Sequence, residues 1–486
     1  MSVGWGQDCV DGVEVELWGE CYNIEYTTYL SLYGNGLTGP ILPEIGYLVN
    51  LIELDLRSNY LSGQIPEEIG NLSNLRVLGL GENLLTGSIS SEIWNLTNLE
   101  ILSLSDNDLI GNIPSEIGNL INLRELYLYS NNLYGSIPLE IGNLSNLSYL
   151  YLSDNDLSGD IPPELGNLIS LQNLVLWGNN LTGQIPSELG NLTNLEVLSL
   201  SDNNLTQTIP SEIGNLFMLR ELFLNSNYLI GQIPNEIGNL INLEYLVLDN
   251  NSLTGYLPEG IENLTNLRFL WLGLNSLTGE VPIGISNLNN LIEISLGGNF
   301  FSGEILSKLI NLINLEYIGL WGNNFIGEIP DEISNLNNLK GIWIDGNYFS
   351  GTLPNSMGDL QSIESINISY NQISGEIPES ICNLGLDWGQ WDNGIWNGIS
   401  NNNLCPPYPE CIGEGNIGYQ DTSECIDCPD SIEGDTNYDG YVNILDIITV
   451  VNCILSNDCN ECFDINYDNS VDILDIISMI NIILGN

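Results

Sequence analysis

The stretch LQNLVLWGNNLTGQIPS, from Leu171 to Ser187, decides the fold of this chain. In its first part leucines alternate with variable residues, which predicts one short strand with one face turned inward. The asparagine at the ninth place, Asn179, can hydrogen-bond the backbone at the turn after that strand. Gly183 and Pro186 then punctuate a second, less regular stretch that returns the chain.

This unit of 24 residues recurs along most of the chain. An imperfect copy covers residues 27–50, and regular copies follow without insertion, starting at Leu51, Leu75, Leu99, Leu123, Leu147, Leu171, Leu195, Leu219, Leu243, Leu267, Leu291, Leu315, Leu339 and Ile363. One copy cannot bury its own leucines, but stacked copies bury them against each other. The sequence therefore predicts a solenoid of about 15 copies over residues 27–384.

The repeated LxGxIP segment resembles the plant-specific class of leucine-rich repeats, and the match covers roughly three quarters of the chain. The resemblance implies a solenoid with a parallel β-sheet on its concave face and an irregular or 3-10 convex side. The ends of such a stack need caps. Residues 1–26, with Trp5 and Trp18, and residues 385–430, with Trp388, Trp391 and Trp396, are placed to serve as them.

The composition is strongly acidic, with 63 acidic residues, 7 basic residues and no histidine, for a formal charge of −56. Such a charge repels nucleic acid and anionic membranes. The absence of histidine removes the usual general base, so an enzyme is not expected. No apolar run approaches the ~20 residues of a membrane helix. The basic residues are scattered singly along the repeats: Arg57, Arg76, Arg124, Arg220, Arg268, Lys308 and Lys340.

The ten cysteines gather at the two ends, with Cys9 and Cys21 near the start and the others from Cys382 onward. This layout predicts disulfide-stapled caps and an oxidising compartment, so the protein is expected to be secreted and extracellular or bound to a cell surface. No signal peptide is visible at the start, which favours a processed or truncated end. The two CxxC pairs at 425–428 and 459–462 suggest zinc as an alternative, but disulfides are favoured because acidic neighbours disfavour thiolates.

The third, fifth and seventh positions of each copy are expected to face outward on the concave sheet, because the fourth and sixth point inward. Aromatic residues occupy 14 of these 45 positions, against 8% of the whole chain. Tyr29, Tyr33 and Phe223 belong to this set, and the candidate ligand-binding residues are Tyr127, Tyr129, Tyr149, Tyr151, Trp177, Tyr245, Phe269, Trp271, Tyr317, Trp321 and Trp343. Aromatic ladders across strands are the alternative explanation. Rings interleaved with acceptors such as Asp55, Asp249 and Asp345 favour a glycan or protein ligand.

Residues 431–486 follow a different pattern, in which two segments align 29 residues apart. Each offers oxygen ligands at loop positions 1, 3, 5, 9 and 12 with a backbone carbonyl at 7, which is the spacing of a helix–loop calcium site. The predicted ligands of two calcium ions are Asp435, Asn437, Asp439, Tyr441, Asn443 and Asp446, then Asp464, Asn466, Asp468, Ser470, Asp472 and Asp475. An acidic solvated tail is the alternative, which the duplicated loop and helix disfavour.

Aspartate at loop position 12 and the duplicated unit resemble a type I dockerin, a small α-helical, EF-hand-like domain. Gly440 matches the turn glycine, whereas Asn469 replaces it in the second loop, which predicts a weaker second site. The resemblance implies docking onto a cohesin-type partner through Ile444, Leu445, Ile473 and Leu474. These residues are apolar where one class of the family has hydroxyl residues.

Two functions fit these features. The first is an extracellular binding or adhesion protein of bacterial origin, which presents its concave face to a glycan or protein and is attached through the dockerin-like module. The second is a structural subunit whose module docks onto another copy of the chain, making a calcium-dependent fibre or layer.

Overall fold

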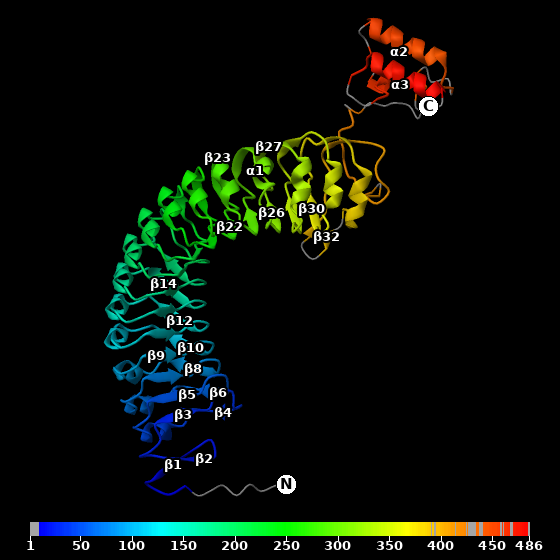
Figure 1. The fold of residues 1–486 in the computed structure, drawn as a ribbon. Coiled ribbons are helices and arrows are strands. Elements are labelled where there is room, and N and C mark those ends of the chain that lie inside the picture. The colour runs from blue at the N-terminus through cyan, green and yellow to red at the C-terminus, as the bar shows by residue number, and fades with distance from the viewer. Residues whose placement is uncertain are drawn as a thin grey trace, which may run out of the picture.

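The structure is a computed structural model of the 486-residue chain. It describes all residues except 1–8, 390, 393–394, 414, 424, 426–433, 437–440, 457–458, 460, 467–469 and 485–486. Figure 1 shows a long arc of stacked turns that runs from an N-terminal hairpin to an irregular C-terminal cap, with two helices beyond it. Stacking buries a continuous row of leucines and isoleucines, which forms one core along the arc.

The concave face is a parallel sheet to which each copy contributes one strand of three residues. Across residues 29–367, all of them described, 15 strands pair in chain order. They are β3 (Tyr29–Ser31), β5 (Glu53–Asp55), β7 (Val77–Gly79), β9 (Ile101–Ser103), β11 (Glu125–Tyr127), β13 (Tyr149–Tyr151), β15 (Asn173–Val175), β17 (Val197–Ser199), β18 (Glu221–Phe223), β20 (Tyr245–Val247), β22 (Phe269–Trp271), β24 (Glu293–Ser295), β26 (Tyr317–Gly319), β28 (Gly341–Trp343) and β30 (Ser365–Asn367). The predicted solenoid and its concave sheet are confirmed.

The register of this sheet follows the 24-residue period. Leu126 pairs with Leu150, and Tyr127 with Tyr151, so that equivalent positions of successive copies lie side by side. The leucines at the fourth and sixth positions, such as Leu126 and Leu128, are fully buried. The third, fifth and seventh positions therefore form the outward surface, which we call the concave surface.

The buried asparagine at the ninth position holds each turn to the one before. Asn179 donates its Nδ2 to the carbonyl oxygens of Leu152, Leu176 and Trp177 at 3.0, 3.1 and 3.3 Å. Its Oδ1 accepts the backbone N–H of Leu157 at 3.0 Å. One side chain thus satisfies four backbone groups that the strand-to-turn transition leaves without partners. The same arrangement recurs at Asn83, Asn107, Asn131, Asn155, Asn203, Asn227, Asn251, Asn275, Asn299, Asn323 and Asn347.

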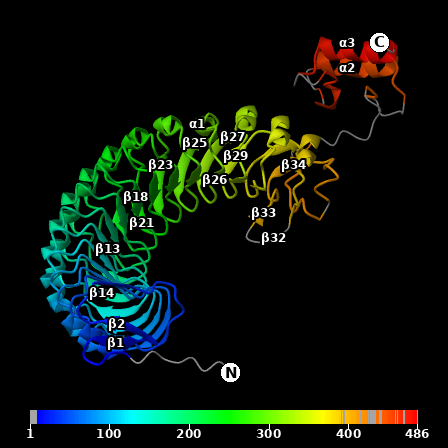
Figure 2. The ribbon, with the colours of Figure 1, turned by 60° about the horizontal axis from the view of Figure 1, so that its bottom comes forward.

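The convex side consists of 3-10 turns, as predicted, and Figure 2 shows them along the outer edge of the arc. They are η1 (Pro43–Tyr47), η2 (Glu67–Asn71), η3 (Ser91–Asn95), η4 (Ser115–Asn119), η5 (Leu139–Asn143), η6 (Pro163–Asn167), η7 (Ser187–Asn191), η8 (Ser211–Asn215), η9 (Asn235–Asn239), η10 (Glu259–Asn263), η11 (Ile283–Asn287), η12 (Asp331–Asn335), η13 (Asn355–Asp359) and η14 (Glu379–Leu384). The copy starting at Leu291 lacks the proline and forms the short helix α1 (Leu306–Leu309) instead.

The stretch that was expected to be irregular between strand and 3-10 turn forms further parallel strands. One sheet contains β4 (Thr38–Gly39), β6 (Tyr60–Gly63), β8 (Leu84–Ser88), β10 (Asp108–Gly111), β12 (Asn132–Gly135), β14 (Asp156–Asp160) and β16 (Asn180–Thr182). The other contains β19 (Ile230–Gly231), β21 (Ser252–Gly255), β23 (Ser276–Glu280), β25 (Phe300–Glu304), β27 (Asn324–Glu328) and β29 (Tyr348–Ser350). The break falls at the copy 195–218, where Gln207 with φ +66° occupies the left-handed position that glycine holds in its neighbours.

Disulfides close the caps at both ends of the core. At the N-terminus, β1 (Glu14–Leu17) and β2 (Glu20–Asn23) form a hairpin, and Cys9 bonds Cys21. Trp18 packs against the core, whereas Trp5 lies outside the described residues. At the C-terminus β31 (Ser374–Glu376) pairs with β34 (Asn403–Cys405), β32 (Trp391–Asp392) pairs with β33 (Ile395–Trp396), and the buried residues include Trp388.

The last part of the chain is helical, with α2 (Ile444–Ser456), η15 (Glu461–Phe463) and α3 (Ile473–Leu484). These elements share a small core of Val450, Cys453, Phe463 and Met479. The described part of the chain contains no apolar helix of the length that a membrane span requires.

Candidate binding surfaces and calcium loops

The first aromatic group lies on β11 and β13 of the concave surface, together with the residues that follow these strands. The ring centroid of Tyr151 lies 5.3 Å from that of Tyr127 and 6.3 Å from that of Tyr129. Tyr149 donates its hydroxyl to Gln172 Oε1 at 2.7 Å. Trp177, in the next copy, is exposed and stands outside these ring contacts. The structure therefore brings three of the predicted rings into contact and leaves the indole of Trp177 on the open surface.

The second aromatic group divides into two stacks. Tyr245 lies parallel to Phe269 with centroids 4.6 Å apart, and Trp271 meets Phe269 edge-on at 6.2 Å. Two copies further along, Tyr317 and Trp343 stack at 6.0 Å with ring planes 2° apart. Trp321 lies flat over Gly297, where a Cβ would come within 2.3 Å of the indole. These contacts fix the rings, as cross-strand ladders would, and leave Trp321 exposed.

Four carboxylates between these rings are held in poorly solvated positions. Burial raises the pKa of Asp249, Asp345 and Glu293 above the ordinary range of a carboxyl group, and it does the same at Glu221. Asp249 Oδ1 is buried and has no hydrogen-bond partner among the described residues. The concave surface thus carries desolvated acids, and among the described residues none of these four forms an ion pair.

We expect Asp249→Asn to stabilise the solenoid at neutral pH, by less than about 1 kcal/mol because the site is partly solvated. The pKa of Asp249 is raised in the folded state, so its ionised form opposes folding above that pKa, and the penalty disappears as the pH falls through it. Thermal melts of both proteins along a pH series measure the effect. Asp55→Asn is the control of opposite sign, because the Arg57 guanidinium lowers the pKa of Asp55. An Asp249→Asn advantage that persists unchanged in acid would contradict the explanation.

A cavity of about 230 Å³ opens on the concave surface between Arg57 and the tyrosines Tyr127 and Tyr129. Two small residues of β7 and its continuation, Gly79 and Gly81, lie on its floor. The other lining residues are Val77, Glu82, Ile101, Ser103, Ser105 and Glu125. Sequence reasoning found the tyrosines but missed Arg57 and the glycines, although Arg57 is the one basic residue among the 45 outward positions.

Five of the basic residues that seemed scattered occupy the same place, the second position of their copies. They are Arg76, Arg124, Arg220, Arg268 and Lys340, and they form ion pairs with Glu100, Glu244 and Glu316 in the same row. Because residues 24 apart lie on neighbouring turns, the row follows one edge of the concave sheet. Each exposed pair contributes little to stability, but together they keep this edge from adding to the negative field of the chain.

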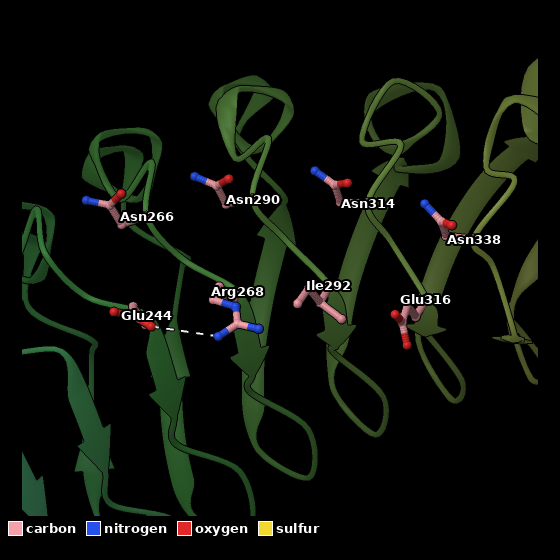
Figure 3. Close-up of a pocket in the computed structure, with 8 residues that line it drawn as sticks. All are labelled: Glu244, Asn266, Arg268, Asn290, Ile292, Asn314, Glu316 and Asn338. Atoms are coloured by element: carbon pink, nitrogen blue, oxygen red, sulfur yellow. Dashed lines mark ion pairs between the residues drawn. The ribbon is translucent and has the colours of Figure 1, made fainter.

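Beside this row lies a groove of about 450 Å³, drawn in Figure 3. Glu244, Arg268, Ile292 and Glu316 form one side, and Figure 3 shows a ladder of asparagines on successive turns along the other. Each of these asparagines donates its Nδ2 to a carbonyl on the preceding turn, as Asn290 does to Thr265 O at 2.8 Å. The ladder therefore links successive turns. The groove arises because the same residue position recurs in each copy.

The calcium loops place their twelfth residues at the start of α2 and α3. Asp446 and Asp475 are fully buried. Asp446 Oδ2 accepts the backbone N–H of Asn443 at 2.8 Å, and Asp475 Oδ2 accepts that of Asp472 at 2.7 Å. Asp475 Oδ1 also accepts the N–H of Ile465 at 2.8 Å. The two loops therefore use the same hydrogen bond, from the residue that directly precedes the helix to the aspartate three residues later.

The ninth loop residues act as helix caps. Asn443 Oδ1 accepts the N–H of Leu445 at 2.9 Å, and Asp472 Oδ1 accepts that of Leu474 at 2.6 Å. Of the other predicted ligands, Asp435 is buried, Tyr441 and Ser470 are exposed, and Asp464 and Asn466 are half-buried. Asn437, Asp439 and Asp468 lie outside the described residues, as do Gly440 and Asn469.

The residues that are described fit a hard divalent cation. Three carboxylates, Asp435, Asp446 and Asp475, are buried in a module that has no lysine or arginine, because the last basic residue of the chain is Lys340. Burying carboxylates in a module without basic side chains is costly. Calcium bound by these oxygens would supply the missing positive charge and tie each loop to its helix.

The predicted docking residues are exposed at matching places on the two helices. Ile444 and Leu445 expose 68% and 53% of their surface, and Ile473 and Leu474 expose 68% and 49%. The order of buried and exposed residues is identical over 442–450 and 471–479. The two helices therefore expose equivalent pairs of apolar side chains at their first turns. We call these four residues the docking face.

The cysteines form disulfides, as expected. The pairs are Cys9–Cys21, Cys382–Cys411, Cys405–Cys425 and Cys453–Cys459, and Cys462 is disulfide-bonded as well. Cys428 lies outside the described residues. Cys425 and Cys459, one from each CxxC pair, are thus each bonded to a cysteine outside those pairs, so at least three of the four cysteines of the zinc alternative are in disulfides.

Comparison with protein families matches the two parts of the chain separately. The leucine-rich repeat region family matches residues 74–209 and 195–302, and the leucine-rich repeat family matches 50–72, 314–336 and 362–384. The dockerin type I domain matches residues 433–484. Type I dockerin domains bind calcium. No curated protein matches the chain.

Several solved structures are similar to the solenoid. One is the ectodomain of the plant membrane receptor kinase GASSHO1/SCHENGEN3 from Arabidopsis thaliana, with 34% identity and a TM-score of 0.76 over 81% of this chain and 46% of that one. Another is the Arabidopsis receptor kinase HAESA, crystallised with a peptide hormone and a co-receptor, with 34% identity and a TM-score of 0.74 over 80% and 64%. This chain thus spans less than two thirds of either ectodomain. A leucine-rich-repeat protein of Leptospira interrogans has 33% identity and a TM-score of 0.57 over 79% of this chain and 87% of its own.

Proposed function

Because the chain belongs to the leucine-rich-repeat proteins and ends in a type I dockerin domain, we propose that it is an extracellular binding protein with two working ends. The concave surface captures a glycan or a protein, and the module at residues 434–484 attaches the chain to a cohesin-type partner. Two calcium ions, one in each loop, hold the module in its folded form. The disulfides fit secretion, and the dockerin favours a bacterial source over a plant one.

The observation that carries the proposal is the docking face, in which α2 and α3 expose equivalent apolar residues next to the buried carboxylates of Asp446 and Asp475. The docking face is an apolar surface that stays exposed among the described residues of the chain. Its side chains are those of Ile444, Leu445, Ile473 and Leu474. Such a face on a small module marks a protein-binding surface. On the solenoid, rigid rings at the outward positions supply large contact area at low entropic cost.

The second candidate is a structural subunit that docks onto another copy of the chain and grows into a calcium-dependent fibre or layer. It is favoured by the same docking face, because a head-to-tail contact between unlike surfaces does not close on itself. The two candidates differ in whether a second gene product is needed for assembly.

Capture on a panel of immobilised cohesins, with calcium and after chelation, tests the attachment. We expect the chain to bind in calcium and to be released by chelation. Replacing Ile444, Leu445, Ile473 and Leu474 by glutamate should weaken binding at least about 100-fold, because the centre of the contact is lost. Leu455→Glu is the matched control, since Leu455 is an exposed leucine of α2 outside the docking face. Equal binding by the fourfold variant would refute the assigned face.

A further inference from the structure

We propose that the cavity between Arg57 and the tyrosines Tyr127 and Tyr129 is a binding site for one neutral sugar residue, at the end of a glycan or within it. The inference rests on the proposed function, because it names the ligand class of the concave surface. Four features of the cavity carry it: the fixed guanidinium, the bare floor, the aromatic wall and the balance of charge.

Asp55 holds the guanidinium of Arg57 in one orientation. Arg57 Nε and its terminal nitrogen each donate to one carboxylate oxygen of Asp55, both at 2.8 Å. A guanidinium has five N–H donors, and the described residues accept no others from this side chain. Arg57 lines the cavity, so its remaining donors are available to a ligand bound there. Arg57 is thus a preorganised donor, fixed before any ligand arrives.

The floor is open because two copies in succession carry small residues at their fifth and seventh positions, Gly79 and Gly81 in one and Ser103 and Ser105 in the next. A Cβ at Gly79 would lie 2.9 Å from Asp55 Oδ1 and 3.0 Å from Arg57 Nε, so glycine lets the ion pair reach across β7. A Cβ at Gly81 would lie 3.1 Å from the hydroxyl oxygens of Ser103 and Ser105. A side chain at Gly81 would therefore crowd the two serine hydroxyls that line the cavity.

The far wall is aromatic and fixed. Tyr127 donates its hydroxyl to Glu125 at 3.0 Å, and both Tyr127 and Tyr129 contact the ring of Tyr151. Burial and the nearby Glu125 raise the pKa of the Tyr127 phenol, which keeps it neutral and able to donate. A rigid ring beside hydrogen-bonding groups suits the apolar face of a sugar ring.

The charges in and around the cavity select against charged ligands. Arg57 is neutralised by Asp55, and the carboxylates of Glu82 and Glu125 line the same cavity. A carboxylate ligand would meet two acids and a guanidinium that is already paired. A cation would meet the guanidinium at one end. Hydroxyl groups both donate and accept, so a neutral polyol satisfies Arg57, Ser103 and Ser105 on one side and the two glutamates on the other.

The site is small, and its volume of about 230 Å³ suits one sugar ring. The neighbouring outward residues Tyr149 and Trp177 continue along the solenoid, so a longer chain would find further rings there. Affinity is therefore expected to rise from monosaccharide to oligosaccharide while the specificity for neutral sugars remains.

Ligand-observed NMR and calorimetry with glucose, galactose, mannose and neutral oligosaccharides test the proposal. Glucuronate and glucosamine serve as the anionic and cationic matches of glucose. We expect binding of at least one neutral sugar, an affinity unchanged between low and high salt, and binding of both charged analogues that is at least about tenfold weaker. Tyr129→Ala and Gly81→Val should each lower the affinity at least about tenfold, because one removes the wall and the other fills the floor.

Tyr60→Ala is the control, since Tyr60 is an exposed ring on β6, outside the cavity and outside the concave surface. Arg57→Lys keeps the charge of Arg57 while losing its planar donor edge, and it should weaken sugar binding without unfolding the copy. The absence of sugar binding, tighter binding of glucuronate, or unchanged affinity in both cavity variants would each overturn the proposal. If no sugar binds but the concave surface captures a protein, the sugar site is wrong and the proposed function stands. If the surface captures neither, both are wrong.

Discussion

Asn179→Ala is expected to lower the free energy of unfolding of the solenoid by about 3 kcal/mol. Alanine removes one acceptor and one amide group that together satisfy the carbonyls of Leu152, Leu176 and Trp177 and the N–H of Leu157. These groups lie inside the stack, where water does not replace the lost partner. Chemical unfolding followed by far-UV circular dichroism measures the change.

Asn194→Ala is the matched control, because Asn194 belongs to the exposed ladder and makes one hydrogen bond, to Ile169 O at 2.8 Å. The loss there is expected to stay below about 1 kcal/mol, since water can take the place of the amide. Equal losses in the two variants would show that the buried asparagines do not carry the stack. A broad, multistep transition in Asn179→Ala alone would agree with a weakened interface between neighbouring copies.

Chelation of calcium is expected to unfold the module at residues 434–484 and to leave the solenoid folded. Among the described residues the core of the module has four buried side chains, while Asp435, Asp446 and Asp475 are buried in a module whose sequence contains no lysine or arginine. Without calcium the buried negative charges oppose folding, and so small a core does not offset them. Hydrogen exchange measured by mass spectrometry should show lost protection over α2 and α3 and unchanged protection over residues 51–384.

Asp446→Asn and Asp475→Asn separate the two loops. Each should weaken calcium binding in its own loop while leaving the melting temperature of the solenoid unchanged, because the module has its own core. Full protection of α2 and α3 after chelation would contradict the calcium assignment. Loss of protection throughout the chain would contradict the independence of the two parts.

Most of the fold could be predicted from the repeated sequence of the solenoid. Leucine or isoleucine at every fourth and sixth position predicts the concave sheet, and the asparagine at every ninth predicts its turn, because each copy repeats the same local energetics. The dockerin domain could be predicted equally well, since its loop residues are close in sequence. The calcium ligands assigned within its loops stay a prediction. The 3-10 turns followed from the family resemblance.

Features that depend on more than one copy were harder to predict. The second sheet forms because short stretches around the repeated glycines pair across turns, and it breaks at Gln207, which no local rule for a single copy reveals. Five basic residues share the second position of their copies, but their ion pairs form between neighbouring copies and therefore depend on the stacking. The cavity at Arg57 needs Asp55, Gly79 and Tyr129 from three different copies, so only the stacked structure brings it together.

Light scattering on the purified chain, with millimolar calcium and again after chelation, tests the central claim most directly. The claim is that one chain is a complete binding unit whose module attaches to a different protein. We therefore expect the mass of a single chain in both conditions, with a more compact particle in calcium as the module folds. Growth into large particles that requires calcium and disappears in the fourfold docking-face variant would contradict this account and establish the self-assembling subunit instead.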